Sequence, residues 1–296
     1  MSLHVFGNII TGYGCAANNR GESEGNITTL QKILWKNQVH TTVSAEAIRW
    51  ALRYYWQTNN LKVNRKWNDD LDDHEWVDAA WSGWAKEMGA TYIDDDLLGY
   101  MKAEGGREEG EKGTTNKRRG VLEVSRAIST TPYAGDISFN ARSGVKVRTS
   151  LYGTEMHATR YQYGFSMTPE RLKEKTRCLD ALDAISGLGE VAGNHSRFLF
   201  DFSPESIVLR VSEDPAPRIL YCLADDDGKI DAVELARKVK AGDIDINELL
   251  VGGAITDLPE IKEMGLKNAF AGIKEAVETA KRTIKEKLGL KDESSH

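Results

Sequence analysis

The spacing of apolar residues along the chain predicts an interleaved set of β-strands and α-helices. Residues 156–167 form the clearest strand, because Tyr161, Tyr163 and Phe165 share one face while Gln162 lies on the other. Alternation or short apolar runs predict strands over the following segments: 3–11, 120–129, 156–167, 198–202, 206–211 and 218–223. Glycine and proline residues between these runs indicate turns.

Apolar residues at helical spacing predict helices between these strands. Ser44 is the expected N-cap of a helix that runs to about Gln57 and buries Ile48 and Leu52. A second helix is expected over 168–186, where a threonine cap is followed by proline at the first helical position. The order is then strand, helix, strand, strand, helix, strand, which is that of the ferredoxin-like unit and of RNA-recognition folds.

The sequence therefore predicts an α+β fold built on a ferredoxin-like, RRM-like domain. A β-hairpin or long loop, punctuated by proline and glycine, is expected to project from it, and the Trp-rich insertion is expected to be helical. A long amphipathic helix over about 259–288 is expected to close the chain. The expected parts are the RRM-like domain (1–58 and 117–225), its hairpin (130–155), the helical acidic insertion (59–116) and a helical C-terminal extension (226–296).

Charge is distributed unevenly along the chain, although the net charge of −6 alone argues against a nucleic-acid partner. Residues 1–66 hold eight Lys/Arg and three Asp/Glu, and residues 117–165 hold eight and three. Between them, residues 67–116 hold four Lys/Arg and fourteen Asp/Glu. Two basic blocks thus flank an acidic insert, which favours local binding of a polyanion. Ordinary variation of solvated surface charge gives the same pattern, and the two interpretations stay open here.

Several classes of protein are excluded by what the chain does not contain. It has no apolar run of about 18 residues or more, and no basic, apolar start typical of a signal peptide, so a cytoplasmic protein without a membrane partner is expected. Cys15, Cys178 and Cys222 are widely spaced and form no CxxC pair, which argues against disulfides and a zinc site. No metal and no cofactor is therefore expected.

Two motifs with familiar spacings do not support their usual functions. The run from Asp225 to Asp231 places leucine at the first position of an EF-hand loop, so a turn before a helix is expected instead of a calcium site. The glycines of 187–193 follow a predicted helix instead of a strand, which argues against a dinucleotide site. No HExxH or GxSxG motif occurs, and Asp136 is the one acid singled out as a candidate catalytic residue.

Three polar segments are candidates for binding phosphate. Arg49 and Arg53 are four residues apart and share one helix face. The run 18–20 combines two short amides with one guanidinium. The glycine-rich loop allows a phosphate to approach the backbone closely, with Asn194 and Arg197 following it. For each segment, a solvated turn or surface is the alternative.

Four stretches together resemble the DevR-type CRISPR-associated autoregulator family. They are Gly12-Tyr13-Gly14 through Asn18-Asn19-Arg20-Gly21, His40 to Arg53, Ser129 to Asp136, and Gly187 to Phe202. The resemblance extends over nearly the whole chain up to about Gly253. Several motifs in the same order are more specific than any one of them.

This family is similar to the Cas-seven-type backbone subunits of type I Cascade, with I-B as the expected subtype. The resemblance implies an RRM-like palm, a helical fingers insertion and a β-hairpin thumb. It implies a non-catalytic subunit that binds guide RNA (crRNA), forms a helical filament with other copies of itself and with other Cascade subunits, and meets target DNA through guide pairing. The residues it assigns to RNA binding are Asn18, Asn19, Arg20, Ser44, Arg49, Arg53, Arg142, Lys146, Gly189, Gly193, Asn194 and Arg197.

Two other functions stay open at this point. Related backbone subunits in RNA-cleaving complexes use a loop aspartate with a metal ion, and Asp136 is the residue to test for a target-RNA endonuclease. The family name also suggests an autoregulatory DNA-binding protein, although no helix-turn-helix is evident.

Overall fold

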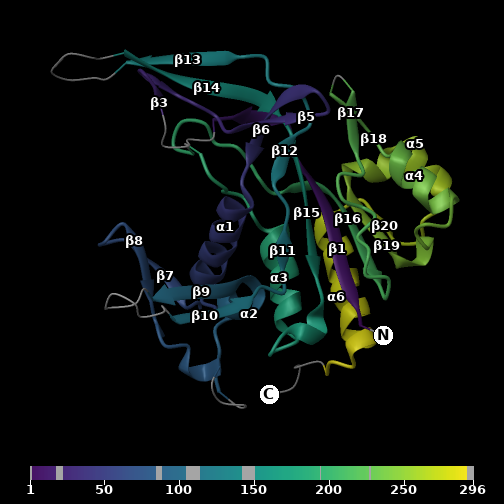
Figure 1. Cartoon of the computed structure of the whole chain (residues 1–296). Coiled ribbons are helices and arrows are strands. Elements are labelled where there is room, and N and C mark those ends of the chain that lie inside the picture. The colour runs from purple at the N-terminus through teal and green to yellow at the C-terminus, as the bar shows by residue number, and fades with distance from the viewer. Residues whose placement is uncertain are drawn as a thin grey trace.

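A nine-stranded sheet forms the centre of the described part of the computed structural model (Figure 1). Its strands are antiparallel, except that β19 and β20 are parallel. The structure describes residues 2–17, 23–84, 89–104, 114–141, 151–193, 195–226 and 228–291. In sheet order the strands are β20 (Ala269–Phe270), β19 (Leu249–Gly253), β16 (Pro204–Ser212), β1 (His4–Thr11), β15 (Tyr161–Met167), β12 (Ala127–Ser129), β6 (Gln38–Val43) and β5 (Lys32–Trp35), with β11 (Glu123–Val124) also paired to β15.

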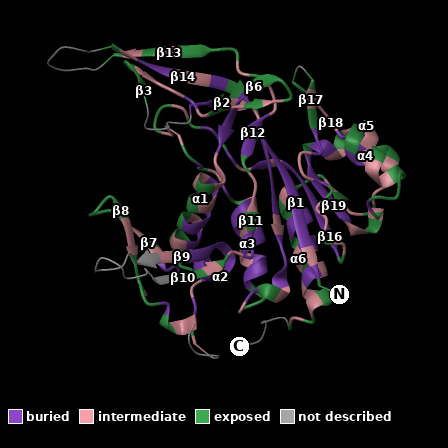
Figure 2. Ribbon diagram, in the orientation of Figure 1, coloured by how far each residue is buried: buried purple, intermediate pink, exposed green. Residues whose placement is uncertain are grey.

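The middle strands are buried on both faces, which explains why β1 has apolar residues at adjacent positions instead of an alternating pattern. Val5 and Ile9 enter one core, and Phe6 and Ile10 enter the core on the opposite face. Figure 2 shows β1 buried along its length. A Cβ on Gly7 would lie 2.1 Å from the ring of Phe165, so glycine is required where β1 meets β15.

Three helices cover one face of the sheet: α1 (Ala45–Thr58), α3 (Arg177–Ser186) and α6 (Ile273–Leu288). The hydroxyl of Ser44 accepts a hydrogen bond from the N–H of Ala47 at 3.1 Å, which confirms the predicted N-cap of α1. Ile48 and Leu52 point into this core, as their spacing predicts. The predicted mixed α+β fold is confirmed. The predicted second helix begins later than expected, because residues 169–171 form a 3-10 turn, η2 (Pro169–Arg171), before α3 starts.

Part of the other face is covered by the segment 213–223 and by the helices α4 (Val233–Lys240) and α5 (Pro259–Met264). Two buried amides attach this segment to the sheet. Asn8 accepts from the N–H of Tyr221 at 2.8 Å, and Gln162 bonds the N–H and carbonyl of Leu223 at 3.1 and 2.9 Å. Residues 198–202 and 218–223, predicted as strands, are irregular, and in 218–223 the backbone groups of Tyr221 and Leu223 bond to these side-chain amides instead of to a strand.

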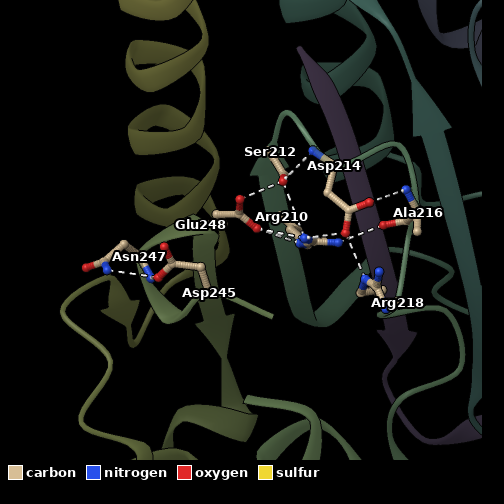
Figure 3. Close-up of polar contacts among 8 residues, drawn as sticks. All are labelled: Arg210, Ser212, Asp214, Ala216, Arg218, Asp245, Asn247 and Glu248. Carbon is tan, nitrogen blue, oxygen red and sulfur yellow. Dashed lines mark hydrogen bonds and ion pairs between the residues drawn. The ribbon is translucent and has the colours of Figure 1, made fainter. Parts of the chain in front are cut away.

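A buried guanidinium links β16 to the chain that follows it (Figure 3). Arg210 is 2% exposed and donates to Glu248 at 2.8 Å and to the carbonyl of Ala216 at 2.6 Å. Asp214 accepts from both Arg210 and Arg218, and these bonds hold its pKa well below the usual range. The network closes the turn after β16 against the 3-10 turn η3 (Ile246–Glu248).

The predicted hairpin is present and projects from the body of the protein (Figure 1). Strands β13 (Asp136–Ala141) and β14 (Leu151–Thr159) pair antiparallel, while 142–150, including Arg142 and Lys146, lie outside the described residues. Three short strands between residues 14 and 28 extend the sheet of this hairpin. They are β2 (Gly14–Ala16), β3 (Ser23–Glu24) and β4 (Ile27–Thr28), of which β2 and β4 pair with β14.

The prediction that residues 59–116 form a helical insertion is wrong. Its strands pair as two hairpins, β7 with β8 and β9 with β10. The carboxylate of Asp78 accepts from the N–H groups of Ala80 and Ser82, a local turn that competes with a helix through the Trp-rich stretch. Its elements are β7 (Arg65–Asn68), β8 (Asp73–Trp76), η1 (Ser82–Trp84), α2 (Ile93–Leu98), β9 (Gly99–Glu104) and β10 (Thr114–Arg119).

The C-terminal extension is also not purely helical. It begins with the turn between β17 (Ala224–Asp226) and β18 (Lys229–Asp231), which agrees with the turn predicted in place of a calcium loop. It then supplies β19 and β20 to the central sheet. The long helix expected over 259–288 is interrupted after α5, where Gly265 adopts a left-handed φ of 68° that ends a helix. The short 3-10 turn η4 (Ala254–Asp257) precedes α5. No helix in the described part of the chain is long and apolar enough to span a membrane.

The acidic run Asp94–Asp95–Asp96 of the insertion is completely buried. These three residues, named the carboxylate node, start α2 and accept hydrogen bonds from several elements. Burial of Asp94 and Asp96 is possible because backbone N–H donors and guanidinium groups meet their charges, whereas Asp95 accepts from the side-chain amide of Asn64. Its partners are Asn64, Arg65 and Arg53 for Asp94, Asn64 for Asp95, and Arg118, Lys173, Glu174 and Arg177 for Asp96.

Replacing Asp96 by alanine is expected to lower the free energy of unfolding by about 3 to 5 kcal/mol. The substitution leaves the buried guanidinium of Arg177 without its 2.9 Å partner and two backbone N–H groups without an acceptor. Urea denaturation measures the change. As a control, Asp257→Ala removes an exposed pair with Lys262 and should change stability by less than about 1 kcal/mol. Equal effects of the two substitutions would contradict the role of the node.

Replacing Asp95 by asparagine is expected to stabilise the protein near pH 7.5, by about 3 kcal/mol. Burial, and then the neighbouring Asp94, raise the pKa of Asp95 to about 6. The folded state therefore holds this proton more tightly than the unfolded chain, whose aspartate pKa is about 3.9. The charged carboxylate lowers stability above pH 6, and this cost disappears as the pH falls towards 4. Urea denaturation of both proteins at pH 7.5 and pH 4 should show a gain only at the higher pH.

Candidate nucleic-acid interface

Five arginines from three elements line an open cleft beside α1. Arg49 and Arg53 come from α1, Arg65 from β7, and Arg118 and Arg119 from β10. Two adjoining hollows of ≈ 530 Å³ each share Arg49 and Arg65 in their walls. We name this surface the arginine cleft, and its size and charge suit an anionic group attached to a larger ligand.

Two of these guanidinium groups are oriented by hydrogen bonds to backbone carbonyls. Arg49 Nη2 donates to the carbonyl of Leu98 at 2.5 Å, and Arg65 Nη2 donates to the carbonyl of Gly99 at 3.0 Å. Both carbonyls lie where α2 ends and β9 begins, so the negative end of a helix faces the cations. Each guanidinium carries five N–H donors, so one such bond orients it and leaves other donors for a ligand.

Arg53 has a different environment from Arg49. It is 8% exposed and lies 3.5 Å from Asp94 of the carboxylate node, whereas Arg49 is half-buried in the wall of the cleft. Burial, and then Arg65, lower the pKa of Arg53 to about 10. Arg53 therefore forms an ion pair with Asp94 that stabilises the fold at the floor of the cleft. Arg49 is the more accessible of the two arginines that were predicted on this helix face.

The cations of the arginine cleft repel one another. Burial, and then Arg65, also lower the pKa of Arg49. Asp94 offsets part of this repulsion, and Glu123 pairs with Arg119 at the rim. A bound phosphate would relieve the remaining repulsion and accept from fork-shaped donors, a geometry that favours arginine over lysine.

The sequence did not single out Arg65, Arg118 or Arg119. Arg118 is bonded to Asp96 at 2.8 Å and lies 4.2 Å from the ring centre of Trp84, so it is positioned by the insertion. Arg118 lies near α1 only when the segment between them, residues 59–116, is folded. The run Lys117-Arg118-Arg119, inside the second basic block, was the one signal for it.

The described residues of the glycine-rich loop, 187–193, do not line the arginine cleft. Gly193 has a left-handed φ of 94°, whereas a Cβ on Gly189 would meet nothing within 4 Å. Arg197 donates to the hydroxyl of Tyr152 on β14 and lies 5.1 Å from its ring centre, at the hairpin. Asn18, Asn19, Arg20 and Asn194, like Arg142 and Lys146, lie outside the described residues. Ser44 caps α1, and its assignment to RNA stays a prediction.

The fold and the cleft define an α+β protein with a cationic surface and a projecting hairpin. The chain belongs to the DevR/Csa2 family, because the family model described as "CRISPR-associated negative auto-regulator DevR/Csa2" matches residues 10–234. It is 52% identical over 269 residues to "CRISPR-associated protein Cas7/Cst2/DevR" from Myxococcus xanthus (strain DK1622). The aligned region covers 87% of this chain and 88% of that protein.

Solved structures support the fold. A chain of "CRISPR RNA-guided surveillance complex, pre-nicking" matches 95% of this chain and 100% of its own length, with a TM-score of 0.60 and 12% identity. A chain of "CRISPR RNA-guided surveillance complex" matches 95% and 99%, with a TM-score of 0.56 and 14% identity. At these identities the likeness concerns the fold alone.

Alanine substitutions are expected to separate the two arginines of α1. Arg53→Ala leaves the buried carboxylate of Asp94 without its ion pair, so the free energy of unfolding should fall by about 3 kcal/mol. Arg49→Ala removes a half-buried side chain with one backbone bond and should cost about 1 kcal/mol. Urea denaturation of both variants measures the difference, and a larger loss for Arg49→Ala would contradict this division of roles.

Proposed function

We propose that this chain is a non-catalytic, guide-RNA-binding backbone subunit of a type I CRISPR Cascade complex, with I-B as the subtype. The observation that carries the proposal is the arginine cleft, found in a member of a CRISPR-associated family. Its fold matches chains of two RNA-guided surveillance complexes. Several copies of the chain would coat one guide RNA together with the other Cascade subunits, and target DNA would pair with the exposed guide bases.

The chemistry of the cleft fits the RNA backbone. Guanidinium groups bind phosphate oxygens through paired N–H donors and read no base sequence. Arg49 and Arg65, each oriented by a backbone carbonyl, would be the principal phosphate contacts, and Arg119 would add charge at the rim. Such contacts suit a subunit that must accept guides of any sequence, because specificity then comes from base pairing.

The order of the strands supports an RRM-like palm within this proposal. Strands β16, β1, β15 and β12 lie in that order, with α1 and α3 on one face, as in a ferredoxin-like unit. The β13–β14 hairpin would act as the thumb, and residues 59–116 would form fingers made of hairpins. Arg197 would support the thumb through Tyr152.

The nuclease alternative depends on Asp136 alone. This residue starts β13 with an exposed side chain. Within the described residues no group of three His, Cys, Asp or Glu side chains is arranged to hold a metal ion. Incubating the assembled complex with complementary RNA and Mg²⁺ tests this alternative, since cleavage that is lost in Asp136→Ala would replace the present proposal.

The double substitution Arg49→Ala, Arg65→Ala is expected to weaken binding to single-stranded RNAs of unrelated sequence by a similar factor. Binding releases fewer counterions when a phosphate contact is lost. The slope of log K against log [salt] should therefore become shallower by about 0.7 for each lost contact. Fluorescence anisotropy with labelled RNA at four salt concentrations measures both quantities.

A matched control removes the same charge from another surface. Arg237→Ala, Lys240→Ala alters exposed residues of α4, outside the arginine cleft, and should change neither affinity nor slope. Unchanged RNA binding in the Arg49, Arg65 variant would refute the proposal. Preference for one duplex DNA over RNA, in the unmodified chain, would favour the autoregulatory reading.

A further inference from the structure

A second concave site lies on the central sheet and shares no lining residue with the arginine cleft. It is a pocket of ≈ 150 Å³ between β5, β6, β12 and the segment around residue 221. Trp35 and Tyr221 form one wall, Thr130 and Asp225 contribute another, and His40 and Ile128 are buried residues that line it. We name it the aromatic pocket.

The aromatic wall is held in place by the surrounding backbone. The ring centres of Trp35 and Tyr221 lie 5.3 Å apart with a tilt of 53° between the planes, and both side chains line the pocket. The hydroxyl of Tyr221 donates to the carbonyl of Arg126 at 2.6 Å, and its backbone N–H donates to Asn8 at 2.8 Å. Tyr221 also has a left-handed φ of 51°, a strained conformation that these bonds maintain. The ring is therefore positioned before any ligand arrives.

The polar groups of the pocket are mainly acceptors. Asp225 already accepts from Thr130 at 2.6 Å and from the N–H of Gly228 at 2.8 Å, and each carboxylate oxygen has a further lone pair. His40 Nδ1 lies 2.7 Å from the carbonyl of Ser129 and donates to it, which leaves Nε2 as an acceptor in the neutral ring. Lys36 is the one cation among the lining residues, and it lies exposed in the turn between β5 and β6.

These features match a nucleobase and not a phosphate. A carboxylate in the wall repels an anion, whereas it accepts from the N–H groups of a base. The volume is below the range of about 300 to 1,000 Å³ typical of sites that enclose a whole drug-sized ligand, so only one ring system of a larger molecule would enter. Exposed aromatic faces bind bases of single strands by stacking, with little dependence on sequence.

We propose that the aromatic pocket binds one base of a single-stranded RNA, stacked on the ring of Trp35 and beside that of Tyr221, with the backbone passing Lys36 outside. The inference rests on the proposed function, because it takes the ligand to be RNA. It adds a contact that is not ionic and that lies on a surface separate from the arginine cleft. The two contacts therefore differ in their dependence on salt and on the presence of bases.

The test compares Trp35→Ala with the unmodified chain on two ligands: a labelled single-stranded RNA and an abasic ribose-phosphate oligomer of the same length. Loss of one stacked base should weaken RNA binding about 5-fold or more. Binding to the abasic oligomer should not change, and the salt slope should stay the same, because no phosphate contact is lost. Trp35→Phe retains a stacking face and should bind RNA nearly as the unmodified chain does.

Leu34→Ala is the matched control, because Leu34 neighbours Trp35 on β5, is 70% exposed and does not line the pocket. It should leave both affinities unchanged. The inference is overturned if Trp35→Ala binds RNA normally. It is also overturned if the substitution lowers the affinities for RNA and for the abasic oligomer equally, which is the result expected of a folding defect or of a protein-docking role. If Arg49→Ala, Arg65→Ala still weakens RNA binding in that case, the proposed function stands without the pocket.

Discussion

Burial of three consecutive carboxylates is the constraint on which the arrangement of this protein depends. Asp94, Asp95 and Asp96 have no exposed surface, and charges in such a position are tolerated only when donors surround them. The donors come from α1, from the start of β7, from β10 and from the segment that leads into α3. Elements distant in sequence are thus held at one point, and each must be in place for the others to be satisfied.

The node also determines which arginines remain accessible. It pairs Arg53 and Arg177 internally and anchors one side of Arg118. Arg49 and Arg65 instead bond to the carbonyls at the end of α2, the helix that begins with the node. The same short helix therefore neutralises one set of cations and presents another set to solvent. The arginine cleft is a consequence of this division, since it forms only where the insertion packs against α1.

The local parts of the fold were predictable from the sequence, and the parts that depend on distant partners were not. The N-cap at Ser44, the alternation along β15 and the projecting hairpin follow from neighbouring residues, so patterns identified them. The insertion was misassigned because its tryptophans pack against Tyr100 and against the guanidinium groups of Arg65 and Arg118, contacts that no local period encodes.

The candidate site shows the same limit. Arg49 was identified from its helix face, and Arg53 was given the same role because the two are one turn apart. What separates them is Asp94, some forty residues away, which lies beside one of them and not the other. Arg65 and Arg118 were missed because their positions are set by the node and by aromatic rings, not by a motif.

In this protein, the number of charged residues in a sequence segment does not show how charge is distributed over the folded surface. Residues 67–116 hold fourteen acidic and four basic residues, yet three of those acids are buried inside the node, where guanidinium groups and backbone N–H donors bind Asp94 and Asp96 and the amide of Asn64 binds Asp95. Exposed acids such as Asp69, Asp70 and Asp72 lie instead around the β7–β8 turn. A chain with a net charge of −6 can therefore present a cationic cleft, because the field at a surface depends on which charges are buried and paired. The insertion, although it is the most acidic part of the chain by sequence, supplies an arginine side chain and two backbone carbonyls to the cationic cleft.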